Sequence, residues 1–450
     1  MKTFLQPLQN LAEMEEIQKQ AKKNRGILEI SGCMESQKAH LMYGLSGLFP
    51  CHLVIAADEK SAKELYEDYR FYDKRVYYYP AKDLLFFQAD IHGNLLIRQR
   101  MQVIRALLER EDEITVVTSI DGCMDYLAPL EKIEKQLIHF RNDSTLDMDK
   151  LTAALVHMGY ERVGQVEMPG QFSIRGGIID IYSLTEENPW RIELWGGEID
   201  SIRSFDAQSQ RSLENLDDVT IYPAAEQPME KNGVSFLDYF KETETLFFLD
   251  ELNHLEENAK AVQEEFQQSC ENRKEKGEIS LSGDWMCTWE ELCHKINDRN
   301  CVAMSLLDPK KSNWKISGQF NITVKSMSSY QSSFELLVKD LKQYKKEGYQ
   351  IVLLSGSRTR AERLAKDLQE EGLNAFYGQD SDRILQPGEI MVAYGHARRG
   401  FEYPLVKFAV ITETDIFGKE QKKRKKKKEY NGKRIQDFSE LSIGDYVVHE

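Results

Sequence analysis

Cysteine motifs, long apolar runs and a signal segment are all missing from this 450-residue sequence. Its seven cysteines are scattered without a C-x-x-C pair, and the nearest group, Cys287, Cys293 and His294, matches no structural zinc spacing. We therefore expect neither a disulfide framework nor a metal site. No apolar stretch approaches the roughly 20 residues that a membrane helix needs, and the N-terminal segment carries acidic and amide side chains where a signal peptide is apolar. The sequence predicts a cytoplasmic protein without a membrane partner.

A net positive charge is also missing. The formal charge is −15, although the run from Lys419 to Lys428 holds eight basic residues and one acid, which leaves −22 on the rest of the chain. Bulk attraction to DNA is therefore not expected. The run has neither aromatic residues nor apolar periodicity. This pattern is typical of a flexible linker, here 419–435, and a nucleic-acid contact is the other interpretation.

What the sequence does contain is enough apolar residues, 41%, to give each of roughly two to four domains a core. In residues 1–150, β-rich runs such as HLVIAAD, RVYYYP and ITVVTS alternate with helical spacing. One such helix is predicted over 60–72, opening on a capping box from Ser61 to Glu64. This βαβ order predicts an α/β domain with a parallel sheet.

The pattern changes in residues 151–225, where strands separated by Pro-Gly and Gly-Gly turns follow a short helix. We expect an antiparallel β-rich (α+β) module that is inserted into the α/β domain. The α/β domain then continues over 226–330, beginning with the buried strand TLFFLDE. Within it, residues 252–330 are predicted mostly as polar helix.

A second, small α/β domain is predicted over 331–418. Its helix is expected to begin at a capping box from Thr359 to Glu362 and to stop at Gly372. After the linker, residues 436–450 begin a new alternating β segment, and the chain ends there. We interpret this as the truncated start of a further domain.

The stretch ILEISGCMESQKAHLMYGL has the outline of a phosphate-binding loop in which two defining residues are changed. A working loop reads G-x-x-x-x-G-K-[ST] after a strand. Here Gly32 and Lys38 remain, but Gln37 replaces the second glycine and Ala39 replaces the hydroxyl residue. Gln37 has a Cβ that resists the required backbone, and Ala39 has no oxygen for Mg²⁺. We therefore expect a strand-to-helix turn with an exposed lysine and no nucleotide cofactor.

Asp250 and Glu251 follow the run LFFL and have the form of the acidic pair that holds Mg²⁺ in nucleotide hydrolases. Because the loop is altered, we expect these acids to cap the following helix instead. No His, Ser or Cys lies in a recognisable nucleophile motif. The sequence thus predicts a binding protein with no catalytic residues and no cofactor.

The β-rich module offers a candidate binding surface. Strand alternation directs Phe172 and Ile174 inward. The outward positions hold Arg175, Arg191, Glu193 and Trp195. Such a mixture of Arg, Glu and Trp is typical of a protein interface. A solvated sheet face with scattered ion pairs is the alternative.

Taken together, the altered loop, the module and its signature RGGIIDIY…RIELWGGEIDSIRSFD…VTIYPA resemble the excision-repair protein UvrB. The segments ARRGFEYPLVKFAVITETDIFG and IGDYVVHE are more similar to the bacterial transcription-repair coupling factors, the Mfd family. The resemblance covers essentially the whole chain. It implies an N-terminal portion of such a factor, with a helicase-like, degenerate P-loop domain and with residues 436–450 opening the domain that binds RNA polymerase.

The resemblance also implies a function. The β-rich module would bind UvrA, the damage-recognition ATPase of nucleotide excision repair, at lesions that stall RNA polymerase. The family's contact motif corresponds to Arg175, Arg191 and Glu193, flanked by Arg162 and Ile179. Where the UvrB pattern has a second arginine, this chain has Ser173. The fragment itself would not be an enzyme. The ATP-dependent translocase motor, and with it RNA polymerase and DNA as partners, would belong to the full-length protein.

A UvrB-like enzyme that binds ATP and grips damaged DNA is the alternative. In UvrB an aromatic-rich hairpin clamps DNA, and the corresponding segment here, YYYPAKDLLFFQADIHGN, keeps aromatic residues but is short. The residues at positions 37 and 39 distinguish the two hypotheses, as does the absence of a second helicase half.

Overall fold

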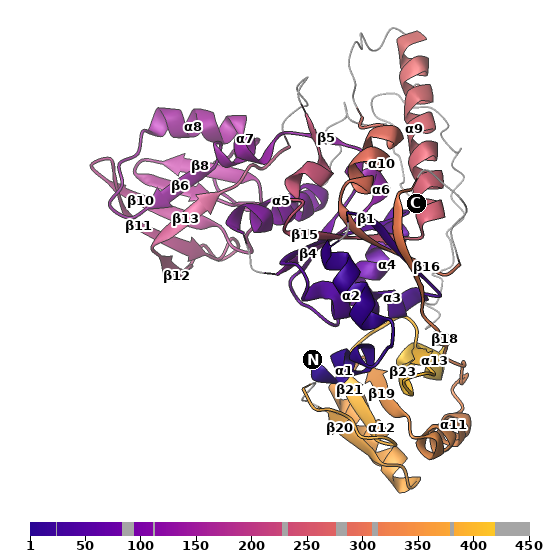
Figure 1. The fold of residues 1–450 in the computed structure, drawn as a ribbon. Coiled ribbons are helices and arrows are strands. Elements are labelled where there is room, and N and C mark those ends of the chain that lie inside the picture. The colour runs from indigo at the N-terminus through magenta and orange to yellow at the C-terminus, as the bar shows by residue number, and fades with distance from the viewer. Residues whose placement is uncertain are drawn as a thin grey trace, which may run out of the picture.

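The computed structural model describes residues 1–23, 25–82, 94–110, 113–226, 233–275, 286–307, 314–378 and 382–418 (Figure 1). The predicted linker, the predicted start of a further domain, and most of the aromatic segment after residue 82 lie outside these ranges. Among the described helices, none combines the length and the apolarity needed to cross a membrane.

A seven-stranded, entirely parallel sheet forms the centre of the molecule, in the order β17-β1-β16-β15-β2-β4-β3. Three of its strands, β1, β4 and β15, are buried along their whole length, which is expected of a parallel sheet covered on both faces. The strands are β1 (Gly26–Ser31), β2 (Cys51–Ala56), β3 (Val76–Tyr79), β4 (Ile114–Ser119), β15 (Thr245–Asp250), β16 (Asn300–Ser305) and β17 (Ile316–Asn321).

Helices cover both faces of this sheet and enclose two separate cores. One face packs against α1 (Lys2–Gln9), α2 (Met14–Lys23), α3 (Glu35–Ser46) and α4 (Glu59–Tyr69). The other face packs against α5 (Asn94–Glu109), α6 (Ile120–Cys123), α9 (Leu252–Glu275) and α10 (Trp289–Asn297). Smaller elements in this unit are β5 (Tyr126–Leu127), α7 (Leu130–Glu134), β14 (Val234–Ser235) and the 3-10 helix η2 (Phe236–Tyr239).

Strands β16 and β17 correct the expectation of mostly polar helix over 252–330. Strand β16 lies between β1 and β15, with Ala303 and Val302 buried on opposite faces of the sheet. A strand that is buried on both faces has no alternation, so its short apolar run carries little periodic signal. The helix prediction holds only for α9 and α10.

Between β4 and β15 the chain leaves the central sheet and builds a second unit, to the left in Figure 1. Its six-stranded sheet has the order β12-β11-β10-β9-β8-β7 and is antiparallel except for β7 with β8. One face packs against α8 (Met148–His157) and a two-stranded pair, β6 (Ile138–Arg141) with β13 (Asp218–Ile221). The six strands are β7 (Glu161–Arg162), β8 (Gln171–Arg175), β9 (Ile178–Ile181), β10 (Trp190–Trp195), β11 (Glu198–Phe205) and β12 (Ser212–Leu216).

The third unit has a mixed sheet in the order β18-β22-β23-β19-β21-β20. Helices α11 (Phe334–Glu347) and α12 (Arg358–Glu370) pack on one face. The other face shares a core with α1, α3 and α4 of the first unit. The remaining elements are β18 (Lys325–Ser326), β19 (Gln350–Ser355), β20 (Ala375–Gly378), β21 (Ile390–Tyr394), β22 (Phe401–Tyr403), β23 (Phe408–Thr412) and α13 (Glu413–Phe417).

Two helix starts differ from the expected capping boxes. Helix α4 begins at Glu59 because Asp58 is its N-cap and accepts the Ser61 N–H at 2.7 Å. Helix α12 begins at Arg358 with Ser357 as N-cap. In each case a polar residue two or three positions upstream of the predicted cap is also a good capping residue, so the pattern alone did not determine the start.

Candidate protein-binding site

The face of the six-stranded sheet that points away from α8 carries two rows of polar side chains. Strand register places Ser173, Asp180, Arg191 and Arg203 side by side across β8, β9, β10 and β11. The next row begins with Arg175 and contains Glu193. Since side chains alternate along a strand, both rows lie opposite the apolar core of the unit.

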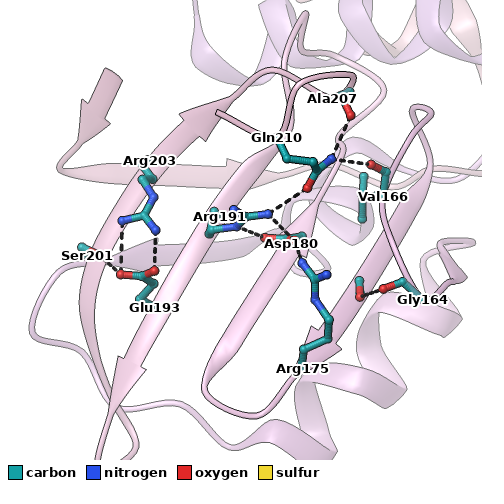
Figure 2. A network of polar contacts seen from close by, with 11 residues as sticks. Gly164, Val166, Arg175, Asp180, Arg191, Glu193, Ser201, Arg203, Ala207 and Gln210 are labelled. Atoms are coloured by element: carbon teal, nitrogen blue, oxygen red, sulfur yellow. Dashed lines mark hydrogen bonds and ion pairs between the residues drawn. The ribbon is translucent and has the colours of Figure 1, made fainter. Parts of the chain in front are cut away.

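The carboxylate of Asp180 is the centre of this face (Figure 2). Arg191 donates from Nε to Oδ1 at 2.7 Å and from Nη2 to Oδ2 at 2.9 Å, and Arg175 donates from Nη2 to Oδ2 at 2.6 Å. Hydrogen bonding to Asp180 is the main reason that the pKa of Arg191 is raised. Two-point pairing of this kind fixes the direction of a guanidinium as well as its charge. The side chain of Asp180 is 1% exposed, that of Arg191 14%, and that of Arg175 46%.

Two neighbouring loops cover part of this face, which corrects the expectation that Arg191 is open to solvent. Gln210 accepts a hydrogen bond from Arg191 Nη2 at 3.0 Å, and the Arg191 guanidinium lies 4.4 Å from the centre of the Phe205 ring. Ser173 is buried and donates to the carbonyl of Gly164 at 2.9 Å. The strand face was predicted correctly, but local chain covers it over Ser173 and Arg191 and leaves Arg175 at the surface.

Glu193 forms a second ion pair beside the first. Arg203 donates from Nη1 to Glu193 Oε2 at 3.2 Å and also pairs through Nη2, and Ser201 donates to the same carboxylate at 3.3 Å. Both charged side chains are half-buried. Trp195 lies at the end of β10 beside the turn formed by Gly196 and Gly197, and it is 83% exposed. The exposed part of the face therefore combines Arg175, the Glu193 pair and a large aromatic ring.

The structure separates the two flanking candidates from this face. Arg162 is in register with Phe172, so it lies on the α8 side of the sheet, where it lines a cavity with Ile174 and Val156. Ile179 is fully buried in the core of the unit. A partner that contacts the Arg175 face cannot touch Ile179 without unfolding the sheet, because the residue lies on the opposite side from Asp180.

The turn from Gly32 to Ala39 and the acidic pair meet at the carboxyl edge of the central sheet. Lys38 Nζ lies 2.6 Å from Asp250 Oδ1 and 2.6 Å from Glu251 Oε1, and the lysine is buried. The expectation of an exposed lysine is therefore wrong. Burial alone would lower the pKa of Lys38, but the two carboxylates outweigh it and raise the pKa. Asp250 and Glu251 thus pair with Lys38, whereas the sequence suggested that they cap α9.

Gln37 is fully buried and is used structurally. Its Oε1 accepts the N–H of Met34 at 3.0 Å, and its Nε2 donates at 2.9 Å to the hydroxyl of Tyr403 in the third unit. Arg399, from the same segment of the third unit, donates its N–H to Ser36 at 3.1 Å. The start of α3 is thus covered by protein at the place where a nucleotide would approach a working loop.

Several residues of these sites were missed from the sequence. Asp180 stands alone among isoleucines in GGIIDIY, and a single acid in an apolar strand is the signal that could have identified it as a buried partner for the arginines. Gln210 and Tyr403 lie 19 and 366 positions from Arg191 and Gln37, and no local pattern connects them. Arg203 lies on the strand that pairs with that of Glu193, ten positions along the chain.

Comparison with known families agrees with the unit built by the six-stranded sheet. Residues 138–226 match the sequence model of the UvrB interaction domain. This range begins at β6, thirteen residues before the module boundary expected from the sequence, and it contains every residue of the Arg175 face. Residues 138–226 are therefore similar to a UvrB interaction domain.

Relatives extend the likeness along almost the whole chain. A transcription-repair-coupling factor of Bacillus subtilis (strain 168) is 31% identical over 496 residues, covering 93% of this chain and 42% of the relative. Another, from Staphylococcus haemolyticus (strain JCSC1435), is 26% identical and is covered over 36% of its length. The chain belongs to the family of transcription-repair coupling factors and corresponds to an N-terminal portion of them, spanning about two fifths of the relatives' length.

Among solved structures, a DEAD-box helicase, Mss116, bound to single-stranded RNA and UDP-BeF, matches 88% of this chain and 64% of its own, with 9% identity and a TM-score of 0.21. A likeness of this size supports no argument about this chain.

Proposed function

We propose that this chain is the part of a transcription-repair coupling factor that recruits UvrA, and that it does so without catalysing a reaction. The match of residues 138–226 to the UvrB interaction domain carries this proposal. The rest of the proposed domain organisation follows the sheets: a UvrB-like region made of residues 1–150 and 226–330, and a separate α/β domain over 331–418. Polymerase binding and ATP-driven translocation on DNA belong, in this proposal, to the full-length protein.

The proposed UvrA surface is the face formed by Arg175, Glu193 and the rim around Trp195. Arg175 is presented to solvent in a fixed direction because Asp180, which is buried, holds one edge of its guanidinium. The remaining N–H groups are available to an acceptor on the partner, and an arginine fork suits a carboxylate. Arg191 supports this face from below by holding Asp180 in place.

The absence of ATPase activity is proposed on the geometry of the altered loop. Lys38, which would have to reach phosphates, is paired with both acids that would have to hold Mg²⁺. Gln37 and Tyr403 fill the space at the start of α3. These contacts argue against the alternative of a UvrB-like enzyme that binds ATP.

The test is calorimetry of UvrA binding to the wild-type chain and to Arg175→Glu. If the arginine faces an acid on UvrA, reversing its charge lowers the affinity by about 30-fold or more, which corresponds to roughly 2–5 kcal/mol. Folding should be unchanged, since Arg175 lies on the side of the sheet opposite the core and is 46% exposed.

Arg162→Glu is the matched control, because it reverses an exposed arginine on the α8 side of the same sheet. Lys63→Glu, on α4, controls for net charge. Loss of binding in Arg162→Glu with full binding by Arg175→Glu would move the interface to the α8 side. If the wild-type chain does not bind UvrA at all, the recruitment proposal is wrong.

A further inference from the structure

A cleft of about 700 Å³ lies between the first and third units. One wall is the end of α4 and the residues that follow it, including Arg70, Phe71 and Lys74. The other wall is the carboxyl edge of the third unit's sheet, where β19, β20 and β21 end. In open α/β sheets this edge is where ligands usually bind, and clefts at the boundary between units are preferred sites.

The cleft is basic, and no ion pair holds its cations within the part of the chain that the structure describes. Arg70, Lys74 and Arg358 line it and are exposed, and in the described part of the chain no carboxylate lies within ion-pair distance of any of them. By contrast, Arg360, two residues beyond Arg358 on the same helix, pairs with Glu413. The acid in the lining is Glu67, so the three cations leave a net positive charge in a chain that is otherwise strongly negative.

An aromatic ring lies among these cations. Tyr394, the last residue of β21, is 54% exposed in the cleft, and the guanidinium of Arg358 lies 5.5 Å from its ring centre. Two glycines lie nearby, since Gly378 ends β20 and Gly395 follows β21. A side chain at Gly395 would collide with the Phe71 ring and one at Gly378 with Met391, so these glycines let the chain pack closely beside the exposed Tyr394 ring.

Cations on both walls together with an exposed tyrosine on one of them form a combination that single nucleic-acid strands bind. The phosphates lie at the cations, and a base stacks on the ring. A free nucleoside polyphosphate fits less well. Such a ligand needs several donors converging at one point, usually free N–H groups at a helix start. At the start of α12 the N–H of Gly356 already donates to Glu413 Oε2 at 2.8 Å, and that carboxylate repels phosphate.

We propose that this cleft binds a single nucleic-acid strand, with Arg70, Lys74 and Arg358 at the backbone and Tyr394 stacked on a base. This inference is independent of the proposed UvrA surface, which lies on another unit. The strand is recognised by charge and stacking, so little base preference is expected.

The test is fluorescence anisotropy with a labelled thymidine oligonucleotide of about ten nucleotides. Every protein compared carries glutamine at the basic positions of 422–428, so that this run contributes no affinity. Three phosphate contacts predict saturable binding whose logarithmic salt dependence has a slope of about −2. Arg358→Glu should weaken binding about tenfold or more and lower the slope, and Tyr394→Ala should weaken it about fivefold or more without changing the slope.

Arg363→Glu is the matched control, since this exposed arginine lies on α12 but does not line the cleft. It should change the affinity less than twofold, and melting curves should be the same for all variants. Equal losses in Arg363→Glu and Arg358→Glu would show a general charge effect and overturn the proposal. So would absence of saturable binding at low salt, or displacement of the oligonucleotide by micromolar thymidine monophosphate, which would make the cleft a mononucleotide site.

Discussion

At the scale of single residues, Asp180 determines whether the proposed UvrA surface is held in shape. Asp180 is buried, and it pairs with the largely buried Arg191 and with the exposed Arg175. In Asp180→Asn the amide cannot accept both arginines, and Arg191 is left largely buried without its counter-charge. We expect the free energy of unfolding to fall by roughly 2–4 kcal/mol. Urea unfolding measures this, and Arg175→Gln, which removes the exposed partner, should lower it by less than about 1 kcal/mol. Equal effects of the two substitutions would contradict the central role of Asp180.

Lys38 allows a second prediction at this scale, which depends on pH. Burial raises the pKa of Asp250, and Lys38 opposes the rise. A carboxyl with a raised folded pKa holds its proton more tightly in the folded state, so stability declines as the pH rises through that pKa. Lys38→Met removes the opposing charge, raises the pKa further and extends the decline to higher pH. The variant's deficit in unfolding free energy should therefore be small near pH 4 and reach roughly 3 kcal/mol at neutral pH.

Urea unfolding of this variant at several pH values between 4 and 8 measures the effect. Lys63→Met is the control, since Lys63 forms an exposed ion pair with Glu59 and should have little effect at any pH. A deficit for Lys38→Met that is independent of pH would mean that Asp250 does not depend on the lysine for its charge.

At the scale of elements, the start of α3 shows how packing bears on the proposed lack of nucleotide binding. The sequence suggests that Gln37 and Ala39 alone prevent nucleotide binding. In the structure, the hydroxyl of Tyr403 from β22 also contacts this helix. It accepts a hydrogen bond from Gln37 and lies 3.2 Å from His40 Nδ1. We therefore expect that the double substitution Gln37→Gly with Ala39→Ser, which restores the motif, does not restore Mg²⁺-dependent ATP binding. Titration with a fluorescent ATP analogue tests this, and micromolar binding that disappears on adding Lys38→Ala would contradict it.

The elements also show how far the sequence could predict this fold. Runs such as ITVVTS and HLVIAAD were predicted as strands because they are apolar and rich in β-branched residues. In β8 and β10, the alternation of side chains along a strand predicted which residues point away from the core. Arg175 and Glu193 lie on that face in the structure. Strand β16 was missed because a short run buried on both faces resembles many other apolar segments. Burial of Arg191 could not be predicted, because the covering residue, Gln210, lies 19 positions along the chain.

At the scale of the whole molecule, the sequence predicted separate domains but not how the third unit joins the first. The two share a continuous core, in which the ring of Phe4 contacts both Tyr72 of the first unit and Phe408 of the third. These contacts join segments more than 300 positions apart, and each apolar residue looks, in sequence, like part of its own domain's core. The shared core means that the third unit fixes the cleft proposed for a nucleic-acid strand, because it forms one of its walls.

Arg398 provides the last prediction, which concerns this junction. Its backbone N–H and its Nε donate to Asp68 Oδ1 and Oδ2, both at 2.9 Å, and its guanidinium also pairs with Glu64. The side chain of Asp68 is fully buried, and burial raises the pKa of Asp68 against the pull of Arg398. In Arg398→Ala this carboxylate loses its cation, and we expect the contact between the units to weaken by roughly 3 kcal/mol. Hydrogen exchange should then show residues 331–418 opening well before the central sheet, whereas in the wild type the two are protected together. Lys342→Ala, which breaks an exposed pair with Glu371 inside the third unit, should leave the protection pattern unchanged. If Arg398→Ala loosens both units equally, or neither, then the shared apolar core rather than this ion pair holds the junction together.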